Sequence, residues 1–147
     1  MNKTEVKNIN TTALAYLGDA VYEVAVRKFI METGQHHADR LHQIAIRFVR
    51  AEGQAFAIKQ LMKELSEEEQ ALVKRARNRK ITSKPKHTHP VTYKLATAFE
   101  AFIGYLYLAG ETERLDWFIY RAITIINQRG AKLWQRKRRK CVIKPEI

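Results

Sequence analysis

Three carboxylates lie in segments of the sequence that are otherwise almost free of charge. The run from 13 to 26, ALAYLGDAVYEVAV, is apolar or small at nearly every other position and contains Asp19 and Glu23. These two acids are four residues apart, so they share one face of a helix. The run from 97 to 109, TAFEAFIGYLYLA, has Glu100 as its one charged residue. A carboxylate in an apolar helix is costly unless a cation or several donors meet it.

Each acidic run also contains a glycine where alanine would favour the helix by about 1 kcal/mol. Gly18 precedes Asp19, and Gly104 lies one turn beyond Glu100. Such glycines predict a close contact between the two helices, which would bring Asp19, Glu100 and, as a further candidate, Glu23 towards one point. Converging carboxylates repel each other, and a hard divalent cation is the usual remedy. The pattern therefore indicates a metal site.

A purely structural alternative stays open at this point. Glu23 could pair with Arg27 one turn later, and Glu100 with a lysine or arginine elsewhere, as ordinary salt bridges. His87 and His89 form a His-x-His in a basic stretch, which suits solvent or phosphate better than zinc. The sequence contains no Ser/His/Asp order, P-loop, Gly-x-Gly-x-x-Gly or Cys-x-x-Cys, so acyl transfer, nucleotide hydrolysis and dinucleotide redox chemistry have no support.

Helices must position these acids, and the apolar spacing predicts six of them. Asn10 or Thr11 is a candidate N-cap for the first helix, and Ser66 with Glu69 forms a capping box that begins the fourth. The prolines between Lys80 and Pro90 predict an exposed loop. The six predicted helices cover residues 12–30, 38–45, 49–65, 66–79, 91–109 and 111–128.

No strand alternation, internal repeat or second domain is visible in the sequence, so we predict an all-α helical bundle. One domain is expected over residues 1–130, followed by a basic C-terminal tail over residues 131–147. The cations of this tail, beside Trp134, either add non-specific affinity for a polyanion or have no role.

The charge balance indicates the kind of partner. Lys and Arg number 27 against 15 Asp and Glu, a net charge of +12 that draws polyanions. No apolar run reaches the ~20 residues that span a bilayer, and the N-terminus lacks the apolar stretch of a secretion signal. We therefore expect nucleic acid as the partner, no membrane association, and a cytoplasmic location.

Seven lysines and arginines lie in residues 74–86, which we call the basic segment. It contains no acid, whereas solvated faces normally mix both signs. Duplex RNA is recognised by its shape and by phosphate and 2′-hydroxyl contacts, for which arginines and a short loop suffice. The residues expected to bind RNA are Lys74, Arg75, Arg77, Asn78, Arg79, Lys80, Lys84 and Lys86.

Two runs resemble the motifs of the ribonuclease III family. Residues 16–21, Tyr-Leu-Gly-Asp-Ala-Val, resemble its signature Leu-Glu-Phe-Leu-Gly-Asp-Ala-Val, and residues 97–104, Thr-Ala-Phe-Glu-Ala-Phe-Ile-Gly, resemble its second acidic motif, Asp-Thr-Phe-Glu-Ala-Leu-Ile-Gly. The sequences of these motifs are most similar to those of the Mini-III branch, in which the ribonuclease III domain stands alone. Residues 75–78, Arg-Ala-Arg-Asn, are similar to its Arg-Gly-Arg-Asn. The resemblance spans residues 12–127.

This resemblance implies an all-helical ribonuclease III catalytic (endonuclease) domain that forms a homodimer. It also implies Mg²⁺ at the acidic site, cleavage of double-stranded RNA to products with 5′-phosphates, and maturation of large-subunit (23S) ribosomal RNA precursor ends. Asp19 and Glu100 are carried over as metal ligands and catalytic residues, with Glu23 as a helper.

The sequence departs from the wider family at two acidic positions. Ala15 stands where the signature has a glutamate four residues before its aspartate, and Thr97 stands where the second motif begins with aspartate. With two carboxylates fewer than the family pattern, we expect a poorer metal site. The alternative function is therefore a non-catalytic assembly factor that binds structured RNA with a degenerate ribonuclease III fold. A helical DNA-binding regulator is a third possibility, although no helix-turn-helix sequence motif supports it.

Overall fold

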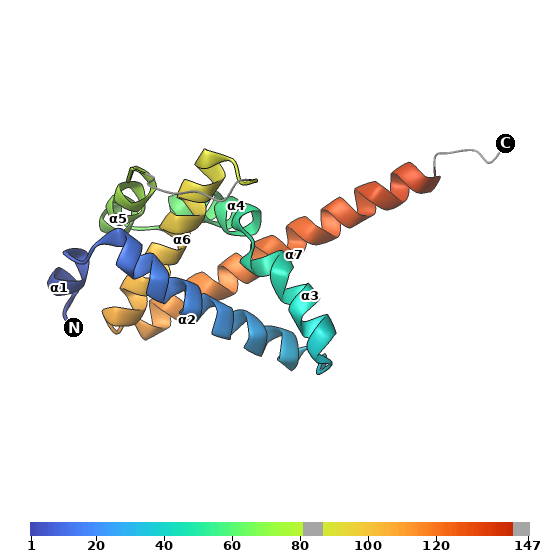
Figure 1. The fold of residues 1–147 in the computed structure, drawn as a ribbon, viewed down its shortest axis with the longest axis horizontal. Coiled ribbons are helices and arrows are strands. Elements are labelled where there is room, and N and C mark those ends of the chain that lie inside the picture. The colour runs from blue at the N-terminus through green and yellow to red at the C-terminus, as the bar shows by residue number, and fades with distance from the viewer. Residues whose placement is uncertain (81–86, 143–147) are drawn as a thin grey trace.

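The computed structural model describes residues 1–80 and 87–142, and all the regular structure within these ranges is helical (Figure 1). The predicted all-α fold is therefore confirmed. The elements are α1 (Lys3–Lys7), α2 (Thr11–Glu32), α3 (Ala38–Val49), α4 (Ala51–Leu61), a 3-10 turn η1 (Met62–Glu64), α5 (Glu67–Arg77), α6 (Pro90–Leu108) and α7 (Thr112–Val142).

Helix α6 forms the centre of the bundle, and α2, α4, α5 and α7 all pack against it. It is apolar nearly all round, and ten of its residues from Leu95 to Leu106 are buried. Phe99 and Phe102 are completely buried and contact Phe118 of α7, with the Phe102 and Phe118 rings edge-on at 4.8 Å. Burial of each such ring contributes about 1.5–3 kcal/mol. These packing contacts hold the helix that carries Glu100 in place.

The predicted helix starts and stops are mostly confirmed. The Asn10 side chain accepts a hydrogen bond from the backbone N–H of Thr12 at 2.8 Å and so caps α2. Ser66 and Glu69 exchange the two hydrogen bonds of a capping box at the start of α5. Gly110 follows α6 with a positive φ of 71°, a conformation that glycine adopts without strain. These signals are local, and the sequence shows them directly.

The corner between α3 and α4 differs from the prediction. We expected a helix to end at residue 45 and the next to begin at 49, but α3 runs on to Val49, and Arg50, with φ −70° and ψ 153°, turns the chain into α4. The Tyr22 hydroxyl donates to the carbonyl of Phe48 at 2.9 Å, and the Gln54 amide donates to the carbonyl of Val49 at 3.1 Å. Side chains from other turns therefore satisfy the carbonyls that α3 leaves open where it ends.

Two further helix boundaries were not predicted. Helix α1 is short, and Asn2 and Glu5 form its capping box. Helix α7 was expected to end at Gln128, before Gly130, but it continues to Val142 and projects from the bundle (Figure 1). A helical glycine costs about 1 kcal/mol relative to alanine and does not by itself end a helix. The first part of the predicted tail is therefore helical.

The described helices also bear on the membrane prediction. None of them combines the length and the hydropathy that a membrane span requires.

Candidate active site

The two acidic runs cross where their glycines lie. A Cβ atom added at Gly18 would overlap the backbone carbonyl of Glu100, and one added at Gly104 would overlap the backbone carbonyl of Leu14. The backbones of α2 and α6 are therefore in direct contact at two points, one turn apart on each helix. The close helix contact predicted from the glycines is confirmed. We call Gly18, Asp19, Glu100 and Gly104 the acidic crossing.

The crossing brings Asp19 and Glu100 together. Glu100 is half-buried on α6, whereas Asp19 is exposed on α2. Burial, and then the charge of Asp19, raises the pKa of Glu100 to about 8. Partial burial, and then the charge of Glu23, raises the pKa of Asp19. The two carboxylates thus repel each other, and neither forms an ion pair with a lysine or arginine within residues 1–80 and 87–142.

Glu23 has a different environment. Its carboxylate accepts a hydrogen bond from Arg27 at 2.8 Å, in an ion pair one turn apart on α2. Its charge still raises the pKa of Asp19, so it lies near the crossing. The structural alternative considered for Glu23 is thus present in the structure, and a role in metal binding would require this ion pair to open. The corresponding alternative, an ion pair of Glu100 with a lysine or arginine, is not found among the described residues.

A cleft of about 370 Å³ opens beside Glu100 between α2, α4 and α6. Ala15 and Thr97, the positions where the resembling motifs have acids, both line this cleft. The Thr97 hydroxyl donates to the backbone carbonyl of Tyr93 at 3.0 Å, so its proton is turned towards its own helix. In the part of the chain that the structure describes, no three His, Cys, Asp or Glu residues gather closely enough to hold a metal ion. The site has two converging carboxylates.

The donor set of the acidic crossing fits Mg²⁺. Carboxylate oxygens are hard ligands, and Mg²⁺ is often held by one or two carboxylates while waters and phosphate oxygens complete its shell. Asp19 and Glu100 supply this number, and the cleft that Glu100 lines leaves room for the remaining ligands. A cation there would also offset the burial, and then the neighbouring negative charges, that raise the pKa of both groups.

Gln54 belongs to this site and was not singled out from the sequence. Its side chain lines the cleft beside Glu100 and is 1% exposed, and it is one of two buried polar residues in the part of the chain that the structure describes. The sequence does contain a sign that Gln54 is buried, because Gln54 lies at helical spacing from Ala51 and Ile58, on the apolar face of α4. A glutamine on an apolar helix face indicates a functional site only when the partner of its side-chain amide is known.

Two arginines of the basic segment bind the chain's own N-terminal region. The Arg75 guanidinium donates to the backbone carbonyl of Lys7 at 2.7 Å, and the Arg79 guanidinium donates to the side chain of Asn10. These contacts fasten the end of α5 to the connection between α1 and α2. Each uses one of the five N–H donors that a guanidinium has.

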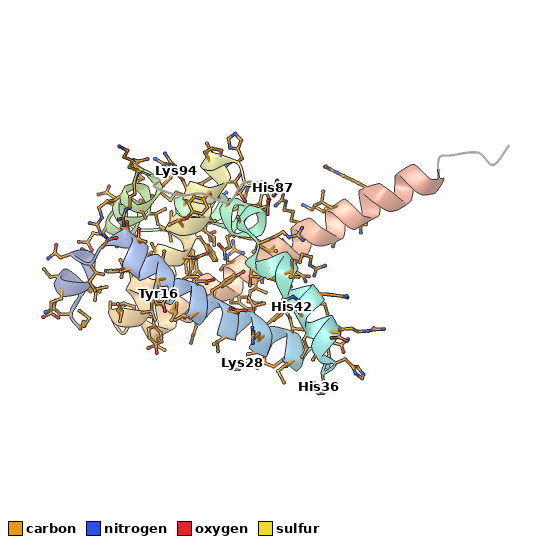
Figure 2. All side chains as sticks on the ribbon, viewed as in Figure 1. Tyr16, Lys28, His36, His42, His87 and Lys94 are labelled. Atoms are coloured by element: carbon orange, nitrogen blue, oxygen red, sulfur yellow. The ribbon has the colours of Figure 1, made fainter. Side chains whose placement is uncertain are left out.

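The other predicted RNA-binding residues have fewer contacts. Arg77 donates to the side chain of Asn78 at 3.2 Å, and Lys74 and Lys80 are exposed. Thr88, which follows the basic segment, lines the cleft beside Glu100. Figure 2 shows His87 near the start of α6, in the same region. The predicted RNA-binding residues Lys84 and Lys86 lie outside the described residues.

One face of α2 carries exposed apolar side chains. Tyr16 is 85% exposed and Val24 is 67% exposed, and Met31 follows two turns later. Figure 2 shows Tyr16 on the outer side of α2. The sequence run is apolar on nearly every side, yet only part of it is covered in the single chain. Exposed apolar side chains that share one face of a helix are of the kind that contact with another molecule would cover.

Basic residues also gather between α4 and α7. They line a groove of about 550 Å³, and the Arg129 guanidinium lies over the Phe56 ring at 4.7 Å. The groove continues along the part of α7 that projects from the bundle, beyond Gly130. Its cations are Lys63, Arg121, Arg129, Lys132 and Arg136.

Comparisons with known proteins agree with the fold. The family model for the Ribonuclease III domain matches residues 12–111. The chain is 45% identical to the Mini-ribonuclease 3 of Symbiobacterium thermophilum, over 78% of this chain and 88% of that protein. It is 42% identical to the Mini-ribonuclease 3 of Clostridium tetani, over 78% and 76%. An X-ray crystal structure of a protein from Fusobacterium nucleatum, 32% identical, superposes with a TM-score of 0.73 and covers 80% of this chain and 93% of that one.

Proposed function

The chain belongs to the ribonuclease III family as a double-strand-specific endoribonuclease, and from this premise we propose that it cuts RNA with Mg²⁺ at the acidic crossing. One observation carries the metal proposal. Glu100 is a half-buried carboxylate on the central helix, it faces a second carboxylate, and its pKa is raised to about 8. A divalent cation is the simplest compensation for such a pair.

The catalytic roles follow from the positions of the two acids. Asp19 and Glu100 would hold the metal from two helices whose separation is set by Gly18 and Gly104. When bound, Mg²⁺ supplies an activated water and positive charge over the phosphoryl oxygens. Asp19 is exposed, so the scissile phosphate can approach from its side, while Glu100 anchors the site to the core. Attack of water on phosphorus with departure of the 3′ oxygen leaves a 5′-phosphate.

The basic segment is proposed to bind the duplex. Arg75 and Arg79 each retain donors beyond those used on Lys7 and Asn10, and the fixed ends of these side chains reduce the entropy lost on binding phosphate. Thr88, two residues beyond the end of the segment in the sequence, lines the cleft beside Glu100, and this supports a duplex that contacts both the segment and the acidic crossing.

We extend the proposal to a homodimer that matures ribosomal RNA precursors in the cytoplasm. The exposed apolar stripe of α2 supports the dimer, since a two-fold axis would bury Tyr16 and Val24 against a second copy. Asp19 lies on the same helix, so pairing through α2 would set two acidic crossings near one duplex. The role in 23S precursor maturation rests on the resemblance to the Mini-III branch.

Cleavage of a plain RNA duplex by the purified protein tests this proposal. We expect cutting in Mg²⁺, none in EDTA, and 5′-phosphate ends on the products, with a DNA duplex of the same sequence left intact. Duplex binding without cleavage at any Mg²⁺ concentration would instead favour the non-catalytic assembly factor, which the absent carboxylates at Ala15 and Thr97 make the second candidate. Equal affinity for RNA and DNA duplexes would favour the DNA-binding regulator.

A further inference from the structure

We propose that Gln54 is a positioning residue that orients the Glu100 carboxylate towards Asp19 for metal binding. This inference rests on the proposed metal-dependent function and adds a residue of α4 to it. Gln54 does not touch the reacting atoms in this assignment, because it acts through Glu100.

The placement of Gln54 supports this role. Its amide is buried and lines the same cleft as Glu100. The Nε2 atom donates one hydrogen bond to the carbonyl of Val49 at 3.1 Å, and an amide nitrogen has two protons to donate. The second proton is available to the Glu100 carboxyl, which lines the same cleft, and the nearby amide lowers the pKa of Glu100 against the larger rise caused by burial and Asp19.

The corner between α3 and α4 explains how this amide is held. The carbonyls of Phe48 and Val49 end α3, and they accept hydrogen bonds from Tyr22 and Gln54. Tyr22 lies on α2, three residues beyond Asp19. Its ring also meets the ring of Phe99 edge-on, with the centroids 4.9 Å apart. The corner is therefore tied to both helices of the acidic crossing.

A purely structural role is the competing explanation, because Gln54 also satisfies the carbonyl of Val49. The chain contains a matched control for it. Gln70 is partly buried, and its Nε2 donates to the carbonyls of Met62 and Leu65, at 2.8 and 3.3 Å, where α4 passes through η1 into α5. Gln70 does not line the cleft beside Glu100. Loss of either amide leaves helix-end carbonyls unpaired, but only loss of Gln54 affects Glu100.

The experiment compares Gln54→Leu, Gln54→Met and Gln70→Leu with the wild-type protein. Binding of Mn²⁺ as a substitute for Mg²⁺ is measured without RNA by electron paramagnetic resonance. Thermal unfolding and the kcat and KM for duplex cleavage are measured in parallel. Groups that orient a metal ligand typically contribute about 10- to 100-fold in metal affinity or activity. We expect both Gln54 variants to bind Mn²⁺ about 10-fold or more weakly, with lower kcat and unchanged KM for RNA.

Gln70→Leu should bind Mn²⁺ as the wild type does, even if it unfolds at a lower temperature. Gln54→Met keeps the length of the side chain and provides the comparison if the leucine variant does not fold. Wild-type Mn²⁺ affinity and kcat in a folded Gln54 variant would overturn the proposal, as would equal losses in the Gln54 and Gln70 variants. A wild-type protein that binds Mn²⁺ but cuts no duplex would overturn the enzymatic function, and the Mn²⁺ comparison would still decide the role of Gln54.

Discussion

The acidic crossing and the basic segment are built in opposite ways. At the crossing, Gly18 and Gly104 let two backbones touch, so the positions of Asp19 and Glu100 are set by the core. In the described part of the basic segment, residues 74–80, the cations lie at the end of α5, and Arg75, Arg77 and Arg79 each donate a single hydrogen bond, such as that from Arg75 to the N-terminal connection. Bond cleavage needs fixed atoms, whereas attraction of a polyanion needs only charge and spare donors.

The difference predicts how each region responds to change. Substitutions at the crossing should act on chemistry or on folding, with steep effects. Substitutions in the basic segment should act gradually and depend on salt. The following changes test this contrast, from the largest expected effect to the smallest.

Asp19→Asn should lower the rate of duplex cleavage by roughly 10²- to 10³-fold or more, because it keeps the shape of the side chain and removes the charge that a cation needs. Folding and duplex binding should persist, since Asp19 is exposed and pairs with no cation in the described residues. Single-turnover cleavage rates, with binding measured in EDTA, check this. Near-normal cleavage by this variant would contradict the assignment of Asp19 to the active site.

Gly18→Ala should destabilise the fold by about 3 kcal/mol or more, because its Cβ would overlap the backbone of Glu100, which cannot move without shifting α6. Gly130→Ala is the matched control. Its Cβ would meet only the Arg47 side chain at an ordinary 3.5 Å, so a gain of up to about 1 kcal/mol from helix propensity is expected. Urea unfolding measures both. Equal stabilities would mean that the helices do not touch as described.

The pH dependence of stability should report on Glu100. Its folded pKa of about 8 lies above the ordinary value of 4.5, so the metal-free folded protein binds more protons than the unfolded chain between these values. The free energy of unfolding should therefore fall as pH rises from about 4.5 to 8. Glu100→Gln should remove this loss, and so be more stable than the wild type at pH 8.5 and similar to it at pH 4. Parallel curves for the two proteins in EDTA would contradict the raised pKa.

Removal of basic-segment cations should have a smaller, salt-dependent effect. Arg77→Ala, alone and with Arg75→Ala, should weaken binding to unrelated RNA duplexes about equally and lower the slope of log affinity against log salt by about one unit or less per contact. The double variant also loses the hydrogen bond to Lys7, so helix content and unfolding temperature must be followed. An unchanged salt slope would exclude these arginines from the RNA surface.

Truncation after Gly130 is the comparison for this prediction and should have the smallest effect on cleavage. It removes Lys132 and Arg136 from the groove between α4 and α7 but no residue of the acidic crossing. Some low-salt affinity should be lost, with cleavage retained. If truncation abolished cleavage while the double arginine variant cut normally, the roles of the two basic surfaces would be reversed.

The parts of the fold that were predicted from the sequence depend on local signals. The Ser66 capping box needs only residues three apart, and the acidic crossing was indicated by glycines and acids within single helical runs. The corner at Arg50 was missed because its carbonyls are satisfied by Tyr22 and Gln54, and the partnership of Tyr22 with α3 exists only in the folded bundle.

The same distinction explains the site. Asp19 and Glu100 were predicted because an acid in an apolar run is conspicuous. Gln54 was not, since a glutamine in a helix is ordinary until its surroundings are known to be buried. The run of α7 through Gly130 was missed because a glycine weakens a helix by an amount that the neighbouring turns can outweigh.

The distance along the chain between the two halves of the acidic crossing has a consequence during protein synthesis. Asp19 leaves the ribosome first, and at about 5–20 residues per second the roughly 80 residues that separate it from Glu100 take on the order of 4–16 s to follow. Until α6 has emerged and closed against α2, the growing chain holds one carboxylate and none of the backbone contact that aligns the pair. With the active site proposed at the acidic crossing, we expect a nascent chain that lacks α6 to have no nuclease activity, and the site to form only when nearly the whole bundle is available to fold.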